Sequence, residues 1–243
     1  MITGGTRGIG YGIANCLARD GYDLILGYNA NVERAKAAQK ELEQRHGGRV
    51  ASWAGELARP ETLEAAFEVV RRDFGGRLTA FIHNAGLWPG LTTARTAEMP
   101  DDFSDETELD FFNYFYKVYP LAFKQGMMLA AKCEGFAHAV AISMPGCNTT
   151  QVPRVESECA GQAKAAMEYL VRTHALRHGP HNITVNAVIP GIVESEAWEK
   201  CGTELKSLAE GGVRDRPLAR WGTALDVGEA VAFLLLIEKT LVD

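Results

Sequence analysis

The chain has 243 residues, of which 47% are hydrophobic and 23% charged, a balance typical of a globular protein rather than a disordered or fibrous one. The formal net charge of −6 argues against an electrostatic grip on nucleic acid or on an anionic membrane, because both need clustered basic charge. The longest unbroken apolar run, 230–237, is far shorter than the roughly 20 residues that a membrane-spanning helix needs.

The cysteines and histidines do not form a recognisable metal site. The five cysteines are widely spaced and include no Cys-x-x-Cys pair, so they predict neither a disulfide framework nor a zinc cluster. His83, His138 and His174 lie in apolar patterns without metal-ligand spacing, and we interpret them as core or surface residues. No basic leader followed by an apolar segment precedes the first motif, so we expect a cytoplasmic protein.

Short apolar runs alternate with longer amphipathic stretches along the chain. Several of the runs are apolar on both faces, as expected of parallel strands covered by helices on both sides. The predicted strands are 22–28, 49–53, 78–83, 136–143 and 183–189.

Helical periodicity fills the intervals between these strands. Ile9, Ile13 and Leu17 share one face after the first glycine cluster. Similar faces follow within 63–74 and 227–235, and Thr223 is placed to cap the last helix.

The alternation predicts one α/β domain over residues 1–243, a Rossmann-type doubly wound parallel sheet with helices on both faces. Both ends look short. Only Met1 and Ile2 precede the first glycine turn, where a central strand of about five or six residues is expected. Either the ends are trimmed or neighbouring segments fill those positions.

A glycine cluster opens the chain at residues 3–10, with the sequence TGGTRGIG, and runs directly into the first predicted helix. Its glycines allow a tight turn and a close approach of backbone to a pyrophosphate. The helix N-terminus adds unpaired N–H groups and a partial positive charge. A plain turn is the alternative interpretation, but the strand–turn–helix position favours nucleotide binding.

Three motifs in the right order resemble the short-chain dehydrogenase/reductase family. Residues 3–10 look like its Thr-Gly-x-x-x-Gly-x-Gly loop, and residues 84–86 (Asn-Ala-Gly) look like the turn after its fourth strand. Residues 190–195 look like its Pro-Gly-x-x-x-Thr segment beside the nicotinamide amide, with Ser195 in place of threonine. The resemblance covers nearly the whole chain and implies an oxidoreductase.

The family typically uses an Asn, a Ser, a Tyr and a Lys, the last two spaced Tyr-x-x-x-Lys. The resemblance implies catalytic roles for Asn113, Ser143 and Lys164, and a contact of Lys164 with the nicotinamide ribose. Ala160 stands where the tyrosine belongs, and the chain has no tyrosine between positions 119 and 169. Ser157 occupies the wider tyrosine spacing of related enoyl reductases, in a segment longer than is usual.

The missing tyrosine changes the expected chemistry. Hydride delivered to a carbonyl carbon leaves negative charge on oxygen, and a phenol beside an ammonium can stabilise and protonate that oxygen. General acid catalysis contributes ~10²–10⁴-fold, so its loss would slow turnover without abolishing cofactor binding. The sequence leaves four other proton donors open: Ser143, water ordered by Lys164, Ser157, or a group on the substrate.

Charge at the nucleotide site favours NADP over NAD. An acid after the second strand would bond the ribose 2′-hydroxyl of NAD, but Asn29 stands there, and Arg7 can pair with a 2′-phosphate. Glu56 and Leu57 fit the family's residues near the adenine. The complete predicted cofactor set is Gly4, Thr6, Arg7, Gly8, Ile9, Gly10, Asn29, Glu56, Leu57, Asn84, Ala85, Gly86, Lys164, Pro190, Gly191, Val193 and Ser195.

The stretch 192–220 resembles the mobile substrate lid of the family and contains Trp198 and Cys201. Trp88 and Pro89 are expected to line the same pocket, and these residues favour an apolar or aromatic substrate. We also expect a homodimer or homotetramer assembled through the helices at 111–119 and 167–178.

Two functions remain open. The first is an NADP(H)-dependent oxidoreductase that reduces a carbonyl or conjugated alkene of a small molecule with an altered proton donor. The second is a catalytically silent NADP(H)-binding redox sensor. The retained Asn113, Ser143 and Lys164 favour the enzyme, and the absent tyrosine favours the sensor. The sequence leaves the substrate, the reaction direction and the oligomer size undetermined.

Overall fold

A six-stranded parallel sheet forms the centre of the molecule, with the strand order β3-β2-β1-β4-β5-β6. The computed structural model describes residues 1–86, 106–153, 158–196, 198, 202–214 and 217–236. The predicted fold class is confirmed. The strands are β1 (Ile2–Thr3), β2 (Leu24–Tyr28), β3 (Val50–Ala54), β4 (Ala80–His83), β5 (His138–Ile142) and β6 (Thr184–Val188).

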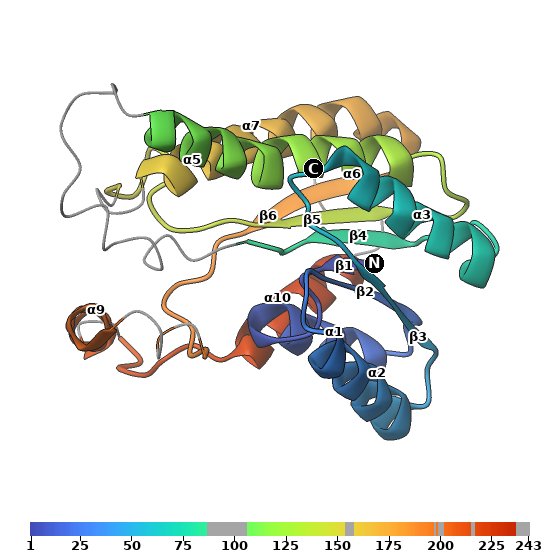
Figure 1. Cartoon of the computed structure of the whole chain (residues 1–243), viewed down its shortest axis with the longest axis horizontal. Helices are drawn as coiled ribbons and strands as arrows, with labels where there is room; N and C mark the ends of the chain where they lie inside the picture. The colour runs from blue at the N-terminus through green and yellow to red at the C-terminus, as the bar shows by residue number, and fades with distance from the viewer. Residues whose placement is uncertain (87–105, 154–157, 197, 199–201, 215–216, 237–243) are drawn as a thin grey trace.

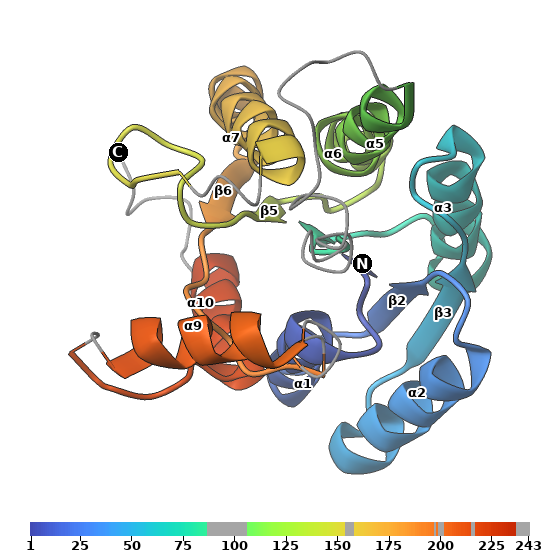
Figure 2. The same cartoon turned by 60° about the vertical axis from the view of Figure 1, so that its left-hand side comes forward.

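Helices cover both faces of this sheet. Figure 1 shows α3, α5, α6 and α7 on one face and α1, α2 and α10 on the other, and Figure 2 shows the same layers in a turned view. No helix within the described residues is long and apolar enough to cross a membrane. The α-helices are α1 (Gly8–Arg19), α2 (Val32–His46), α3 (Pro60–Phe74), α5 (Glu106–Tyr116), α6 (Ala122–Ala130), α7 (Glu158–His178), α9 (Gly202–Arg214) and α10 (Ala224–Leu236).

Two apolar clusters fill the spaces between sheet and helices. The larger, under α3, α5, α6 and α7, is rich in aromatic side chains, while the other, under α1 and α10, is mostly aliphatic. Most of the predicted periodic positions are buried, while Ile9, Phe74 and Leu234 are half-buried. The buried ones include Ile13 and Leu17 of α1, Leu63, Phe67 and Val70 of α3, and Val227, Val231 and Leu235 of α10.

Strand β1 was not among the strands predicted from apolar runs, because only two residues form it before the glycine turn. It nevertheless lies in the middle of the sheet, where Ile2 pairs with Leu26 of β2 and with Ile82 of β4. The Ile2 side chain is completely buried. Partner strands on both sides therefore fix a segment that is too short to show a periodic signal.

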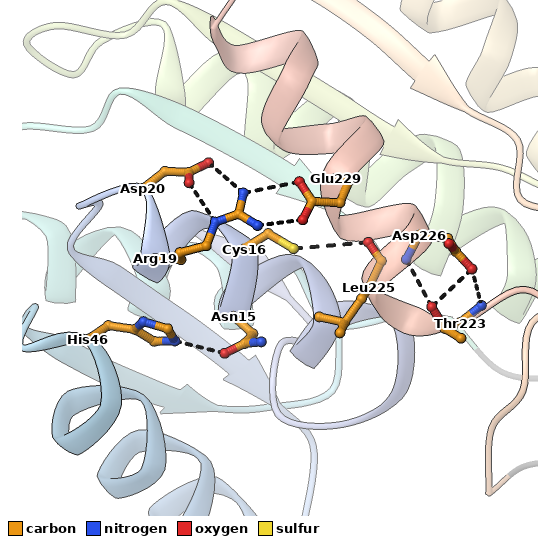
Figure 3. A network of polar contacts seen from close by, with 9 residues as sticks. All are labelled: Asn15, Cys16, Arg19, Asp20, His46, Thr223, Leu225, Asp226 and Glu229. Atoms are coloured by element: carbon orange, nitrogen blue, oxygen red, sulfur yellow. Dashed lines mark hydrogen bonds and ion pairs between the residues drawn. The ribbon is translucent and has the colours of Figure 1, made fainter.

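Helices α1 and α10 pack at very close range. A Cβ atom on Gly12 would lie 2.2 Å from the carbonyl oxygen of Ala224, so only glycine fits at this crossing. Polar contacts join the same helices (Figure 3): Arg19 of α1 pairs with Glu229 of α10. Thr223 caps α10 as predicted, since its Oγ1 accepts from the N–H of Asp226 at 3.1 Å.

The aromatic helix predicted at 111–119 is interrupted. Helix α5 ends at Tyr116 and continues as a π-helical turn over Lys117–Leu121 before α6 begins. Pro120 lies in this turn and has no N–H to donate to the preceding turn, which explains the altered winding. The turn places Tyr119 in the core, where its side chain is 1% exposed.

Candidate active site

The glycine loop between β1 and α1 is folded too tightly for a side chain at Gly10. A Cβ there would lie 2.0 Å from the carbonyl oxygen of Gly4 and 2.5 Å from Nδ2 of Asn84. Arg7 precedes the helix with an extended backbone, its side chain is exposed, and it pairs with no acid among the described residues. The first turn of α1 carries no acidic residue, so this end of the helix is suited to an anion.

The Asn-Ala-Gly turn is fixed to the glycine loop by a saturated set of hydrogen bonds. Oγ1 of Thr3 accepts from the backbone N–H groups of Asn84 at 3.0 Å and Ala85 at 2.9 Å. Nδ2 of Asn84 donates to the carbonyl oxygens of Thr3 at 3.1 Å and Gly4 at 3.0 Å. The two predicted cofactor segments therefore form one rigid unit at the carboxyl ends of β1 and β4.

His83 completes that unit as a neutral core residue. Its Nε2 lies 2.9 Å from the carbonyl oxygen of Val118, which can only accept, so Nε2 carries the proton. Its Nδ1 then accepts from the Thr3 hydroxyl at 3.2 Å, which uses the one donor that Thr3 has. Burial, together with the Lys164 ammonium, lowers the pKa of His83 to about 3. The prediction of a core histidine is consistent with this position.

Lys164 is buried near the carboxyl end of β5. Its Nζ donates to the carbonyl oxygen of Ile142 at 2.6 Å and lies 4.5 Å from the ring centre of Tyr119. Burial lowers the pKa of Lys164 to about 8, although Cys147 and Glu168 favour the charged form. The adjacent Ser143 is also buried, so the structure brings together two of the three predicted catalytic residues.

Three other positions considered for the catalytic set are Ala160, Asn113 and Ser157. Ala160 is one turn before Lys164 on α7, and its side chain is 1% exposed. Asn113 is on α5 with an exposed side chain, whereas Tyr119, in the π-helical turn after α5, contacts Lys164. The catalytic role of Asn113 remains a prediction. Ser157 lies outside the described residues.

Two side chains at this site were not singled out from the sequence. Oγ of Ser143 donates to Oε1 of Glu168 at 2.5 Å, and Glu168 is 5% exposed, one turn after Lys164 on α7. Cys147 lies in the loop after β5, and burial raises the pKa of its thiol, while a hydrogen bond with Ser143 opposes this. The spacing of an acid four residues after the lysine was a usable signal, but its burial and its partner on β5 could come only from the fold.

Asn29 and Glu56, predicted for the adenosine end of the cofactor, hydrogen-bond to each other. Nδ2 of Asn29, after β2, donates to Oε2 of Glu56 at 2.8 Å. Oε1 of Glu56 accepts from the Tyr114 hydroxyl at 3.1 Å and from the N–H of Ala58 at 3.2 Å. Burial, and after it the neighbouring Glu56 carboxylate, raises the pKa of Tyr114 to about 12. Asn29 and Glu56 thus join the ends of β2 and β3 at the edge of the sheet that carries the glycine loop.

The predicted lid at 192–220 is not a continuous loop. Val193 forms a bridge with Gly222, and helix α9 occupies the middle of the stretch. Nε1 of Trp198 donates to the carbonyl oxygen of Val193 at 2.8 Å, and its ring meets that of Trp221 edge to face. The segment after Pro190 is therefore held, through Val193, against Gly222, just before α10 begins. Trp88, Pro89 and Cys201 lie outside the described residues.

Comparisons with known proteins agree with this arrangement. Residues 4–242 match the family model described as Enoyl-(Acyl carrier protein) reductase. The chain is 30% identical over 235 residues to a 3-oxoacyl-[acyl-carrier-protein] reductase FabG of Staphylococcus aureus, covering 96% of this chain and 89% of that protein. It is 31% identical over 241 residues to a peroxisomal 2,4-dienoyl-CoA reductase of Danio rerio, covering 96% and 74%.

A solved structure shows the same likeness in three dimensions. A short chain dehydrogenase from Burkholderia cenocepacia, crystallised with NADP, has a TM-score of 0.81 and 27% sequence identity, covering 99% of this chain and 91% of that one. The glycine loop, the Asn-Ala-Gly turn and the buried lysine beside β5 lie in the order that the motifs predicted. The chain belongs to the short-chain dehydrogenase/reductase family.

Proposed function

We propose that this chain is an NADP(H)-dependent reductase that acts on a carbonyl or a conjugated alkene with an altered proton donor. The observation that carries the proposal is the buried Lys164 ammonium beside Ser143 at the carboxyl end of β5. Gly4 and Asn84 follow β1 and β4 at the same edge of the parallel sheet, where α/β folds bind their ligands. A structural protein has no need for a charged lysine at this buried position.

The residues present fit a dinucleotide. The tight turn at Gly10 lets backbone approach a pyrophosphate, and the N-terminus of α1 is free of acids. When bound, NADPH supplies the hydride. We propose that Arg7 contacts the 2′-phosphate, that Lys164 contacts the nicotinamide ribose, and that Pro190, Gly191, Val193 and Ser195 border the nicotinamide amide. We also propose that the other residues of the predicted cofactor set line the dinucleotide site: Gly4, Thr6, Gly8, Ile9, Gly10, Asn29, Glu56, Leu57, Asn84, Ala85 and Gly86.

The substrate class is proposed from the relatives and from the apolar surroundings of the site. The names of two relatives specify a 3-oxoacyl carbonyl and a conjugated dienoyl group, so both reaction types occur among similar chains. Trp198 packs with Trp221 in a small apolar cluster beside the segment that follows Pro190. An apolar or aromatic carbonyl compound or enone fits these surroundings.

A silent NADP(H)-binding sensor is the second candidate, and the observation that favours it is Ala160. This position holds no phenol, and its side chain is enclosed in the larger core cluster. In that case the nucleotide loop would bind the cofactor without turnover, and a partner would read the bound state.

Titration with NADPH followed by turnover assays tests both candidates. Binding is followed by cofactor fluorescence, and oxidation of NADPH is then measured with ketones, quinones, enones and acyl thioesters. Turnover with one class supports the reductase. Tight binding without turnover in any class supports the sensor, and absence of NADPH binding contradicts both.

We propose that the molecule is one domain and that it self-associates through α5 and α7. Tyr116, Tyr169 and Leu176 support this, because these large apolar side chains are exposed on the two helices, Leu176 to 81%. Light scattering coupled to gel filtration distinguishes a monomer from a homodimer or homotetramer.

A further inference from the structure

Resting on the reductase function proposed above, we propose that Tyr119 is a positioning residue whose aromatic ring keeps Lys164 in its charged form at the cofactor site. The ring gives the buried ammonium a partner that no sequence motif names. Tyr119 lies in the π-helical turn, 45 residues before Lys164 in the chain. The contact between the two side chains is therefore made by the fold.

Lys164 carries its charge with few direct partners. The residue is 8% exposed, and among the described residues its Nζ has one hydrogen-bond partner, the carbonyl oxygen of Ile142. An ammonium has three N–H donors, and its burial is costly unless other groups compensate. Within the part of the chain that the structure describes, no carboxylate lies at ion-pair distance from Nζ. The Tyr119 ring, whose centre is 4.5 Å from Nζ, offers the negative face of its π-system instead.

Three contacts hold the Tyr119 ring in this position. Phe115 stacks on it, with ring centres 5.6 Å apart and planes inclined by 18°. Nε2 of His83 donates to the carbonyl oxygen of the residue before Tyr119 at 2.9 Å, which fixes the turn to β4. The phenol also lies so close to Gly86 that a Cβ atom there would be 2.8 Å from the hydroxyl oxygen. Because Tyr119 is 1% exposed and closely packed, its ring has no free space in which to turn away from the ammonium.

The other titratable groups near Lys164 do not replace the ring. Glu168, one turn further along α7, favours the ammonium, but its carboxylate accepts from the hydroxyl of Ser143. Cys147, in the loop after β5, also favours the charged form, and burial raises the pKa of its thiol. His83 on β4 is neutral at pH 7, since its pKa is lowered to about 3. Burial outweighs the favourable groups and lowers the pKa of Lys164 to about 8, so a contact with the ammonium affects its charge close to neutral pH.

The size of the expected effect follows from the cation–π contact. A ring facing an ammonium at a desolvated site favours the charged form by about one pH unit. Loss of the ring should therefore lower the pKa of Lys164 by about one unit. The charged fraction would then fall about fivefold at pH 8, whereas nearly all Lys164 side chains stay charged at pH 6 in both forms.

Tyr119→Leu and Tyr119→Phe separate the ring from the hydroxyl. The titration of Lys164 is followed by NMR on the chain without cofactor, with isotope-labelled lysine side chains, and its signal is identified by its absence in Lys164→Met. We expect the midpoint to fall by about one pH unit in Tyr119→Leu and to stay at the wild-type value in Tyr119→Phe, which keeps the ring. Tyr22→Leu is the matched control, because Tyr22 packs in the cluster under α1 and α10. Its Lys164 midpoint should equal that of wild type.

NADPH binding shows whether the charge serves the cofactor. In fluorescence titrations, Tyr119→Leu should bind NADPH about fivefold more weakly than wild type at pH 8 and equally well at pH 6. Tyr119→Phe should match wild type at both pH values. Equal weakening at both pH values would mean that Tyr119 only supports the fold, and it would overturn the inference.

Ring fluorination keeps the test decisive if Tyr119→Leu does not fold. Fluorine atoms on the ring in Tyr119→Phe withdraw electrons from its face with little change in size, so each added fluorine should lower the Lys164 midpoint further. A midpoint that ignores fluorination, or one that falls as far in Tyr119→Phe as in Tyr119→Leu, overturns the inference alone. Failure of the wild type to bind NADPH overturns the proposed function, while the lysine titration still measures the contact with the ring.

Discussion

The nucleotide half and the catalytic half of the site keep the family pattern to different degrees. Around β1 and β4, hydrogen bonds join Thr3 and Gly4 of the glycine loop to Asn84 and Ala85. These bonds explain why both predicted motifs need their residue types. Around β5 and α7, the structure brings Lys164 and Ser143 together, Ala160 stands where the family pattern predicts a tyrosine, and Glu168 lies against the serine. In the function that we propose, the pyrophosphate loop and the residues around the reacting atoms therefore lie on separate elements.

This difference has a physical reason. A pyrophosphate is bound by backbone N–H groups, so the loop must keep its shape and cannot tolerate an added Cβ. A proton can be delivered by any group of suitable acidity within reach, so the donor can change while the scaffold remains. Substitutions in the two halves should separate these properties.

The largest effect is expected for Lys164→Met, which changes the catalytic half at its centre. Methionine has a similar volume without the charge, so the fold should persist while stabilisation of the substrate oxygen and the ribose is lost. We expect turnover to fall by ~10²–10³-fold and NADPH affinity to fall less. Steady-state kinetics and fluorescence titration measure the two losses. An unchanged turnover would contradict the placement of Lys164 in the site.

Gly10→Ala should break the nucleotide half alone. The new Cβ would lie 2.0 Å from the carbonyl oxygen of Gly4, so the loop must move. A cost of about 3 kcal/mol corresponds to roughly 100-fold weaker NADPH binding. Gly211→Ala in α9 has open space for its Cβ and is the control, with binding unchanged. Equal NADPH affinity in Gly10→Ala and wild type would show that the cofactor does not approach this loop.

Ala160→Tyr tests whether the catalytic half lacks only a phenol. The new hydroxyl would come one turn before Lys164 on the same helix face. Carbonyl reduction should rise by about 10-fold, and overpacking of this buried position should cost ~1–3 kcal/mol of stability. Turnover and thermal unfolding measure both. A loss of existing activity would mean that the native donor needs the space that alanine leaves.

Arg7→Ala should sharpen the cofactor assignment without touching the catalytic half. Charge-assisted contacts to phosphate contribute ~1.5–3 kcal/mol, so the preference for NADPH over NADH should fall by roughly tenfold or more. Paired titrations with the two cofactors give the ratio. Equal affinities in the wild-type chain would refute the NADP assignment.

The smallest effect concerns pH. Burial lowers the pKa of Lys164 from 10.5 to about 8, so the ammonium that we propose contacts the ribose is lost as pH rises through 8. NADPH binding should weaken above pH 8 in the wild type and not in Lys164→Met. Because the folded pKa is below the unfolded one, the unfolded chain binds more protons between pH 8 and 10.5, and Lys164 should make stability rise across this window. Denaturant titrations at both ends would show the opposite sign if Lys164 were paired by a dominant acid.

Local signals in the sequence determined most of the fold. Alternating apolar runs and helical periodicity identified five strands and the buried faces of α1, α3 and α10, because the burial pattern of these elements repeats along the chain. Strand β1 and the π-helical turn at Pro120 escaped that analysis. Two residues cannot show a period, and the altered winding depends on a single missing N–H.

The sequence by itself also determined the family, the glycine loop, the lysine and the absence of tyrosine at position 160, since these are fixed by residue type and spacing. Only the tertiary structure decided that Glu168 meets Ser143, that Tyr119 covers Lys164 and that Asn84 is bonded to Thr3. The two residues of each pair are 25, 45 and 81 positions apart in the chain, in that order, and no local pattern encodes such contacts. They arise because parallel strands bring their carboxyl ends to one edge of the sheet and the helices pack across it.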